Sequence, residues 1–190
     1  MTEKQIFDLI DSLQLDSQIT IQDIPDLDLY MDQLITLFEK HLASTKRRPE
    51  DKLLTKTMIN NYTKNKLLIP AQKKKYKVDH VLLMLLIYQL KQVTSMEDIK
   101  TLFGFLRDGE SVDHEKLQFV YQKYLDSQVG QLHALKDDAS RIAEDAKEKT
   151  AGSGMESTDS MLMCLLLFQQ SLNYKRLAEK LLDEMTRDAE

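Results

Sequence analysis

The chain has 190 residues, 42% of them hydrophobic and 30% charged, with a formal net charge of -5. Only 5 Gly and 3 Pro stand beside abundant Leu, Lys, Asp, Glu and Gln, a composition that favours helices and argues against a β-sandwich or barrel. The single cysteine, Cys164, excludes an internal disulfide framework and a multi-cysteine zinc site, and predicts a reducing compartment.

Hydrophobic periodicity predicts a helical N-terminal half. Thr55 is a typical N-cap, and Ser95 with Asp98 forms a capping-box pattern. The segment after Asp79 is apolar around most of its helical circumference, so we expect it at the centre of the core. The predicted helices cover residues 3–14, 26–44, 56–64, 79–92 and 96–104.

The C-terminal part follows a different pattern. Apolar residues at steps of four and three predict a long helix over 113–148, and a second helix over 159–187 follows the flexible link 150–157. Two long helices with a short link are expected to pack antiparallel. Their apolar area favours homodimerisation, with packing on the N-terminal domain as the alternative. We therefore predict two domains, 1–108 and 109–190.

Membrane and secretion signals are missing from the sequence. The N-terminal residues do not resemble a signal peptide, since acids interrupt them. The longest apolar runs, 161–168 and 81–87, are too short to cross a bilayer. These features predict a cytoplasmic protein without a membrane partner.

Charge is distributed unevenly along the chain. Residues 46–77 hold 11 bases and two acids, whereas residues 5–39 hold eight acids and no Lys or Arg. Such segregation indicates a basic face on an acidic protein, as nucleic-acid-binding proteins have. A solvated, lysine-rich surface loop is the alternative.

Residues 54–103 contain a series of short motifs: LTKTMINNY (54–62), LLIP (67–70), KY (75–76), DHV (79–81) and SMEDIK (95–100). In this order they resemble the DNA-binding domain of MerR-type regulators. That resemblance implies a winged helix-turn-helix with a short recognition helix and a basic wing. This chain departs from the pattern at Asn60 and Asn61, where the family has an arginine before its paired aromatics, and at Pro49, which interrupts the expected preceding helix. The effector cysteines of metal-sensing relatives are absent.

A second resemblance covers residues 20–107. With IPDLDLYMDQL (24–34) ahead of TKTMINNY (55–62), the chain is similar to an uncharacterised bacterial family, domain of unknown function 1836. This resemblance brings no established activity. Together the observations predict an all-α protein, with a winged helix-turn-helix-like N-terminal domain followed by an antiparallel hairpin of two long helices.

The predicted DNA contacts lie on the short helix and the wing. If Met58, Ile59 and Tyr62 face the core, the opposite helix face holds polar and basic side chains. Lysine can neutralise phosphates, and Asn can pair with adenine in the major groove. The candidate DNA-binding residues are Lys56, Thr57, Asn60, Asn61, Lys64, Lys73, Lys74, Lys75 and Lys77. Simple surface polarity is the alternative for the two asparagines.

Catalysis finds no support in the sequence. The four histidines are scattered without metal-ligand spacing, no glycine-rich loop is present, and Cys164 is expected to be buried in its apolar run. We predict no active site, metal or cofactor. Two functions remain: a transcriptional regulator that binds double-stranded DNA as a homodimer, or a non-catalytic helical protein-interaction module. The second function is favoured if the acids of residues 8–32 fold over the basic segment.

Overall fold

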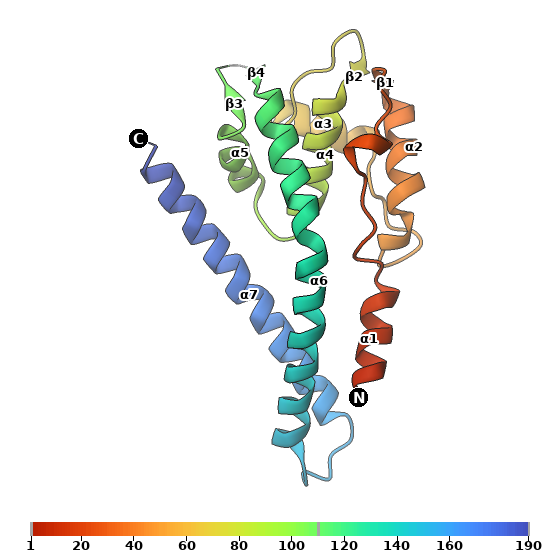
Figure 1. Cartoon of the computed structure of the whole chain (residues 1–190), viewed down its shortest axis with the longest axis vertical. Helices are drawn as coiled ribbons and strands as arrows, with labels where there is room; N and C mark the ends of the chain where they lie inside the picture. Colours follow the sequence, from red (N-terminus) through yellow and green to blue (C-terminus); the bar gives the residue numbers. More distant parts are fainter. Residues whose placement is uncertain (1, 110, 190) are drawn as a thin grey trace. The chain divides into compact units, whose positions relative to one another are not determined.

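The computed structural model describes residues 2–109 and 111–189, and it is mainly helical (Figure 1). The helices are α1 (Glu3–Ser12), α2 (Met31–Leu42), α3 (Lys56–Lys64), α4 (Val78–Leu90), α5 (Met96–Gly104), α6 (His114–Thr150) and α7 (Thr158–Arg187). Two antiparallel pairs of short strands join β1 (Leu29–Tyr30) to β2 (Lys75–Tyr76) and β3 (Arg107–Asp108) to β4 (Ser111–Val112). Among the described residues, no helix is both long and apolar enough to cross a membrane.

The chain divides into two compact units. The larger unit contains Ser17–Asp126 with Leu182–Glu190, and the smaller contains Met1–Asp16 with Ser127–Leu181. Helix α6 therefore supplies its first turns to the larger unit and its remaining turns to the smaller. The predicted domains, 1–108 and 109–190, stay a prediction.

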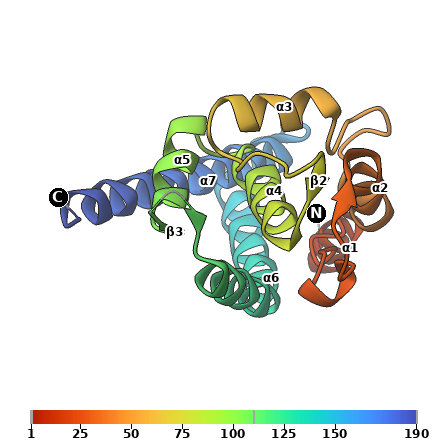
Figure 2. The same cartoon turned by 90° about the horizontal axis from the view of Figure 1, so that it is seen from above.

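Helix α4 is the centre of the larger unit, as its all-round apolar sequence predicts. Every residue from His80 to Ile87 is buried, and Figure 2 shows α2, α3, α5 and the start of α6 around it. At the helix ends of this unit, nearby side chains form hydrogen bonds with backbone groups. For example, the Lys77 amide donates to Nδ1 of His80 over 3.0 Å, and Nε2 of His80 lies 3.3 Å from the Pro70 carbonyl.

The beginning of α6 is tied to the segment that precedes α2. The hydroxyl of Tyr121 donates to the Ile19 carbonyl over 2.6 Å, and both side chains are buried. Burial raises the pKa of the Tyr121 phenol well above its ordinary value, so this hydroxyl remains a hydrogen-bond donor throughout the physiological range.

The smaller unit is a helical hairpin with α1 packed on it. Helices α6 and α7 run antiparallel through the link 151–157 (Figure 1), which confirms the two long C-terminal helices. Lys136 forms an ion pair with Asp11 over 2.7 Å and places its ammonium 5.5 Å from the ring centroid of Phe7. The core of this unit consists of Ile6, Ile10, Ala139, Ile142, Ala146 and Met163.

Two predictions about local structure are wrong. Residues 26–28 are not helical, because Leu29-Tyr30 pairs with Lys75-Tyr76 as a strand and α2 begins only at Met31. Cys164 is exposed rather than buried, since no described residue of the smaller unit packs over its side of α7. The predicted all-α character is confirmed, with two short antiparallel sheets beside the helices.

Candidate nucleic-acid interface

Helix α3 is amphipathic over its nine residues. The hydroxyl of Thr55 accepts from the Met58 amide over 3.2 Å, which caps the first turn. Ile59 and Tyr62 are buried on one face. The opposite face is exposed and carries five of the predicted DNA-binding residues, Lys56, Thr57, Asn60, Asn61 and Lys64.

The exit of α3 is a tight, well-bonded turn. Lys66 adopts a positive φ of 60°, and the amides of Leu67 and Leu68 both donate to the Tyr62 carbonyl, over 2.9 and 3.2 Å. Arg107 then donates to the Lys66 carbonyl over 3.1 Å. The buried Leu67 and Leu68 thus fix where α3 ends, and the β3–β4 hairpin supports that turn from outside.

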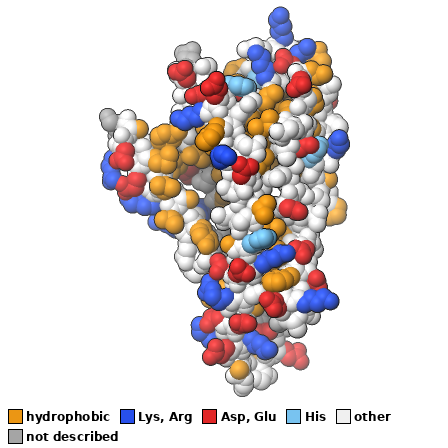
Figure 3. Space-filling model, in the orientation of Figure 1, with side chains coloured by type: hydrophobic (Ala, Val, Ile, Leu, Met, Phe, Trp, Pro, Cys, Tyr) orange, Lys and Arg blue, Asp and Glu red, His pale blue; other side chains and the backbone are white. Residues whose placement is uncertain are grey.

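The wing, residues 72–76, is a hairpin whose tip is a two-residue turn formed by Lys73 and Lys74. Lys73 and Lys74 have φ values of 51° and 64°, and the Lys75 amide donates to the Gln72 carbonyl over 2.9 Å. Two consecutive positive φ values define a type I′ hairpin turn, which normally takes Asn-Gly. Both lysines are exposed at the tip, and Figure 3 shows basic side chains projecting where the wing lies in Figure 1.

The wing and the first turn of α3 both contact the start of α2. Strand pairing sets Tyr30 opposite Lys75, and the Lys75 ammonium lies 5.5 Å from the Tyr30 ring centroid. Two residues later, Asp32 Oδ1 lies 2.8 Å from Nζ of Lys56 at the first position of α3. Residues 30–32 therefore connect the two predicted DNA-binding elements. The buried Tyr76 anchors the wing against His80, with ring centroids 5.6 Å apart.

Acidic residues neutralise only part of the basic segment 46–77. Lys56 pairs with Asp32, and Lys46 pairs with Glu39 over 2.6 Å. Within residues 2–109 and 111–189, the other bases of the segment form no ion pair. Two of the eight acids of residues 5–39 therefore reach the basic segment directly, and the other nine bases keep their charge without an ion pair among the described residues.

Not all predicted site residues share one element. Seven lie on α3 or at the wing tip, whereas Lys75 is half-buried in β2 and Lys77 is exposed at the N-cap of α4. The contact between Asp32 and Lys56 could not be predicted from the sequence, because the two residues lie in different helices. The strained backbone at Lys73 and Lys74 could not be predicted either, since lysine is not a typical residue of this turn.

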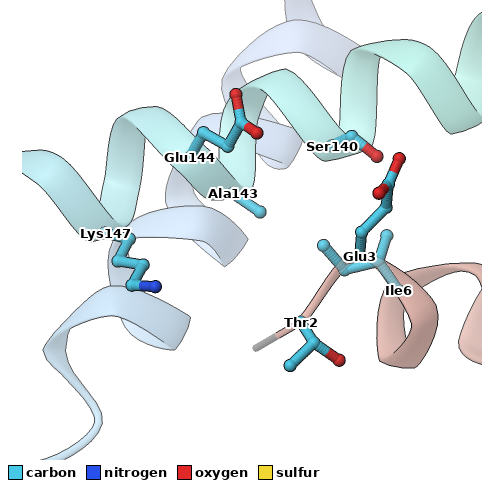
Figure 4. Close-up of a pocket in the computed structure, with 7 residues that line it drawn as sticks. All are labelled: Thr2, Glu3, Ile6, Ser140, Ala143, Glu144 and Lys147. Carbon is cyan, nitrogen blue, oxygen red and sulfur yellow. The ribbon is translucent and has the colours of Figure 1, made fainter.

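A small pocket elsewhere does not form a comparable site. It has a volume of about 160 Å³ and lies in the smaller unit between α1 and α6 (Figure 4). Glu3, Glu144 and Lys147 line it, and Oγ of Ser140 is buried there without a hydrogen-bond partner. The volume is too small for a nucleotide, and the two glutamates repel a phosphate. In the described part of the chain, no group of His, Cys, Asp and Glu could hold a metal ion.

The family model described as "Domain of unknown function (DUF1836)" matches residues 19–124. The chain belongs to the DUF1836 family. The DUF1836 segment coincides with the continuous part of the larger unit, Ser17–Asp126, and so contains α2 to α5, the wing and the first turns of α6. The remaining turns of α6 and all of α7 lie outside it. No curated protein and no solved structure matches the chain.

Proposed function

We propose that the DUF1836 segment binds double-stranded DNA and that the protein is a bacterial transcriptional regulator, dimeric through its C-terminal helices. Helix α3 would enter the major groove, and the wing lysines would contact flanking phosphates. The order of α3, the LLIP exit, the basic wing, α4 and α5 supports the resemblance to a MerR-type winged helix-turn-helix. Residues 43–55 separate α2 from α3, a longer connection than that pattern has.

The wing tip is the observation that carries this proposal. A non-glycine residue with positive φ costs on the order of 1 kcal/mol, and the wing contains two in succession. Among the described residues, neither lysine side chain forms a hydrogen bond, an ion pair or a cation–π contact that would repay this cost. A binding role for their two adjacent positive charges explains why lysine occupies positions that suit Asn-Gly.

The exposed face of α3 supplies groups that can distinguish base pairs. Asn60 and Asn61 each carry one amide donor and one acceptor, which match the N6 and N7 edge of adenine. Lys56 and Lys64 mark the two ends of the helix, where they can reach phosphates on either side of the groove. In a complex, a phosphate would compete with Asp32 for the Lys56 ammonium.

The contact between Asp32 and Lys56 also favours a second function. An acid that neutralises the recognition helix is expected if the fold is a protein-interaction module that no longer binds DNA. The replacement of the MerR arginine by Asn60 agrees with that alternative. The two functions differ in whether the unpaired lysines of the wing contribute to duplex binding.

The double variant Lys73→Asn/Lys74→Gly tests the proposal. It removes two charges but introduces the residues that the turn prefers, so lost binding cannot be attributed to a damaged fold. The matched control is Lys4→Gln/Lys147→Gln, which removes two exposed lysines of the smaller unit. We expect the wing variant to bind a random duplex about 10-fold more weakly at low salt, while the control binds as the wild type. Equal binding by the wing variant would contradict a DNA contact at the wing, and no binding by the wild type would favour the interaction module.

A further inference from the structure

Helix α7 exposes a continuous apolar row that no described residue of the smaller unit covers. Met161, Leu165, Phe168 and Leu172 are 66, 57, 75 and 48% exposed, and their spacing of four, three and four places them on one side of the helix. We call these four residues the α7 seam. On the face drawn in Figure 3, hydrophobic side chains also gather along α7.

The other side of the same turns is already occupied. Met163 is buried in the hairpin core, and Leu162, Leu166 and Leu167 pack partly against it. The first half of α7 is therefore apolar around most of its circumference, which is typical of a helix with neighbours on both sides. A helix that lies on a membrane surface would instead have a strongly charged polar face, and residues 160–174 contain no charged side chain.

We propose that the α7 seam binds the α7 seam of a second copy in antiparallel orientation, with the two-fold axis between Leu165 and Phe168. This inference deepens the proposed dimer, and it does not depend on DNA binding. A spacing of four, three and four reads the same in both directions, so a reversed copy presents a matching row. Met161 would then face Leu172 of the other copy, and Leu165 would face its Phe168, as the self-complementary interface of a two-fold dimer requires.

Charges beyond the seam favour the same orientation. Lys175 and Arg176 follow the seam, where Glu179 lies 3.7 Å from each and leaves one net positive charge on the three residues, and Glu156 precedes the seam. In the antiparallel dimer, Lys175 and Arg176 of one copy lie level with residues 157–158 of the other, next to its Glu156. A parallel dimer would instead place the basic pairs of both copies side by side. Opposite charges at the ends of the seam thus select a second copy in reverse orientation.

The first experiment is sedimentation of the full chain without DNA. We expect the wild type to be a dimer at micromolar concentration, and we expect Leu165→Glu/Phe168→Glu to raise the dissociation constant at least about 30-fold, the loss of a hot-spot side chain. Both residues are exposed in the single chain, so the variant should keep its helical circular dichroism. The matched control is Leu177→Glu. Leu177 is 67% exposed and lies on the opposite side of α7 from Phe168. A monomeric wild type, or a larger effect of Leu177→Glu, would overturn the proposal.

The second experiment determines the orientation by disulfide formation. In a heptad with Leu165 at position a and Phe168 at position d, Cys164 and Ser171 both occupy position g, whereas Gln169 occupies position e. Position g approaches g of the other copy in an antiparallel pair and e in a parallel pair. Ser171→Cys should therefore form an oxidised dimer with the native Cys164, and Gln169→Cys should not. The reverse result would replace the antiparallel dimer with a parallel one.

These outcomes are separate from the test of DNA binding. A dimer that assembles through the seam but does not bind a duplex would contradict only the proposed regulator. If the protein binds a duplex and Leu165→Glu/Phe168→Glu does not change its oligomeric state, only the proposed seam interface is contradicted.

Discussion

Helices α4 and α7 contain the two longest apolar runs of the chain, 81–87 and 161–168, yet their burial is opposite. Every residue of the α4 run is buried. In the α7 run only Met163 is buried, while Met161, Leu165 and Phe168 are among the exposed large hydrophobic residues. An apolar run therefore indicates that a helix needs neighbours, but only the structure shows whether the same chain supplies them.

The two regions also differ in their relation to the family. Helix α4 lies within the DUF1836 segment and holds the core on which α3 and the wing are built, whereas α7 lies outside that segment. The larger unit contains the segment that the family model matches, and the proposed assembly surface lies outside that segment. Substitutions in the two helices should therefore change different properties.

The largest expected effect is that of Leu82→Ala in α4. The Leu82 side chain is fully buried among close-packed neighbours, so its removal leaves a cavity that the surroundings cannot fill completely. The free energy of unfolding should fall by about 2–5 kcal/mol. Urea denaturation followed by circular dichroism measures this change, and a loss below about 1 kcal/mol would show that α4 is not the tightly packed centre.

The next effect concerns the buried hydrogen bond of Tyr121. Tyr121→Phe removes the donor for the Ile19 carbonyl and leaves that oxygen buried without a partner. We expect a loss of about 1–3 kcal/mol in the free energy of unfolding. The control Tyr124→Phe changes an exposed hydroxyl of the same helix and should cost almost nothing. Equal effects of the two substitutions would show that this bond does not hold α6 to the core.

A smaller effect should appear as a pH dependence at the start of α4. Burial lowers the pKa of His80 below its ordinary 6.5, although the Pro70 carbonyl and the nearby Asp79 and Asp28 favour the charged form. The unfolded chain therefore binds a proton at a pH where the folded chain does not. As a result, the free energy of unfolding falls as the pH is lowered. Between about pH 7.5 and 5.5, as histidine in the unfolded chain takes up its proton, we expect His80 to contribute a loss of stability.

Stability curves of the wild type and of His80→Gln over this range isolate that contribution. The curve of His80→Gln should be flatter than that of the wild type. A wild-type slope in His80→Gln would mean that other groups cause the pH dependence.

The smallest effect is that of Leu165→Ala, the counterpart of Leu82→Ala on α7. Leu165 is exposed in the single chain, so at concentrations where the protein is monomeric the free energy of unfolding should change by less than about 0.5 kcal/mol. Denaturation of dilute protein measures this. A loss close to that of Leu82→Ala would erase the contrast between the two helices.

Local signals explain which parts of the fold could be predicted. Helix α3 begins and ends at the predicted residues because Thr55 caps it and its apolar side is clear, and α5 likewise follows Ser95. Strand β1 was missed because its partner, β2, lies beyond α3 in the sequence. Helical periodicity around residues 26–44 could not reveal that distant pairing.

The candidate site was predictable by residue type but not by geometry. Composition and spacing indicated the basic segment and the exposed face of α3. The sequence could not show that Lys73 and Lys74 adopt positive φ, or that Asp32 reaches Lys56, because both depend on how β1 and β2 meet. The exposure of Cys164 could not be predicted either, because it depends on which sides of α7 have a packed neighbour.

The central claim, that α3 and the wing bind duplex DNA, is tested most directly by the salt dependence of binding. Fluorescence anisotropy with a random duplex at several salt concentrations gives the slope of log affinity against log salt, near -0.9 for each phosphate neutralised. We predict a wild-type slope of about -4 or steeper, and a slope about 2 units shallower for Lys73→Asn/Lys74→Gly. No binding at low salt, or the same slope in both proteins, would contradict the account.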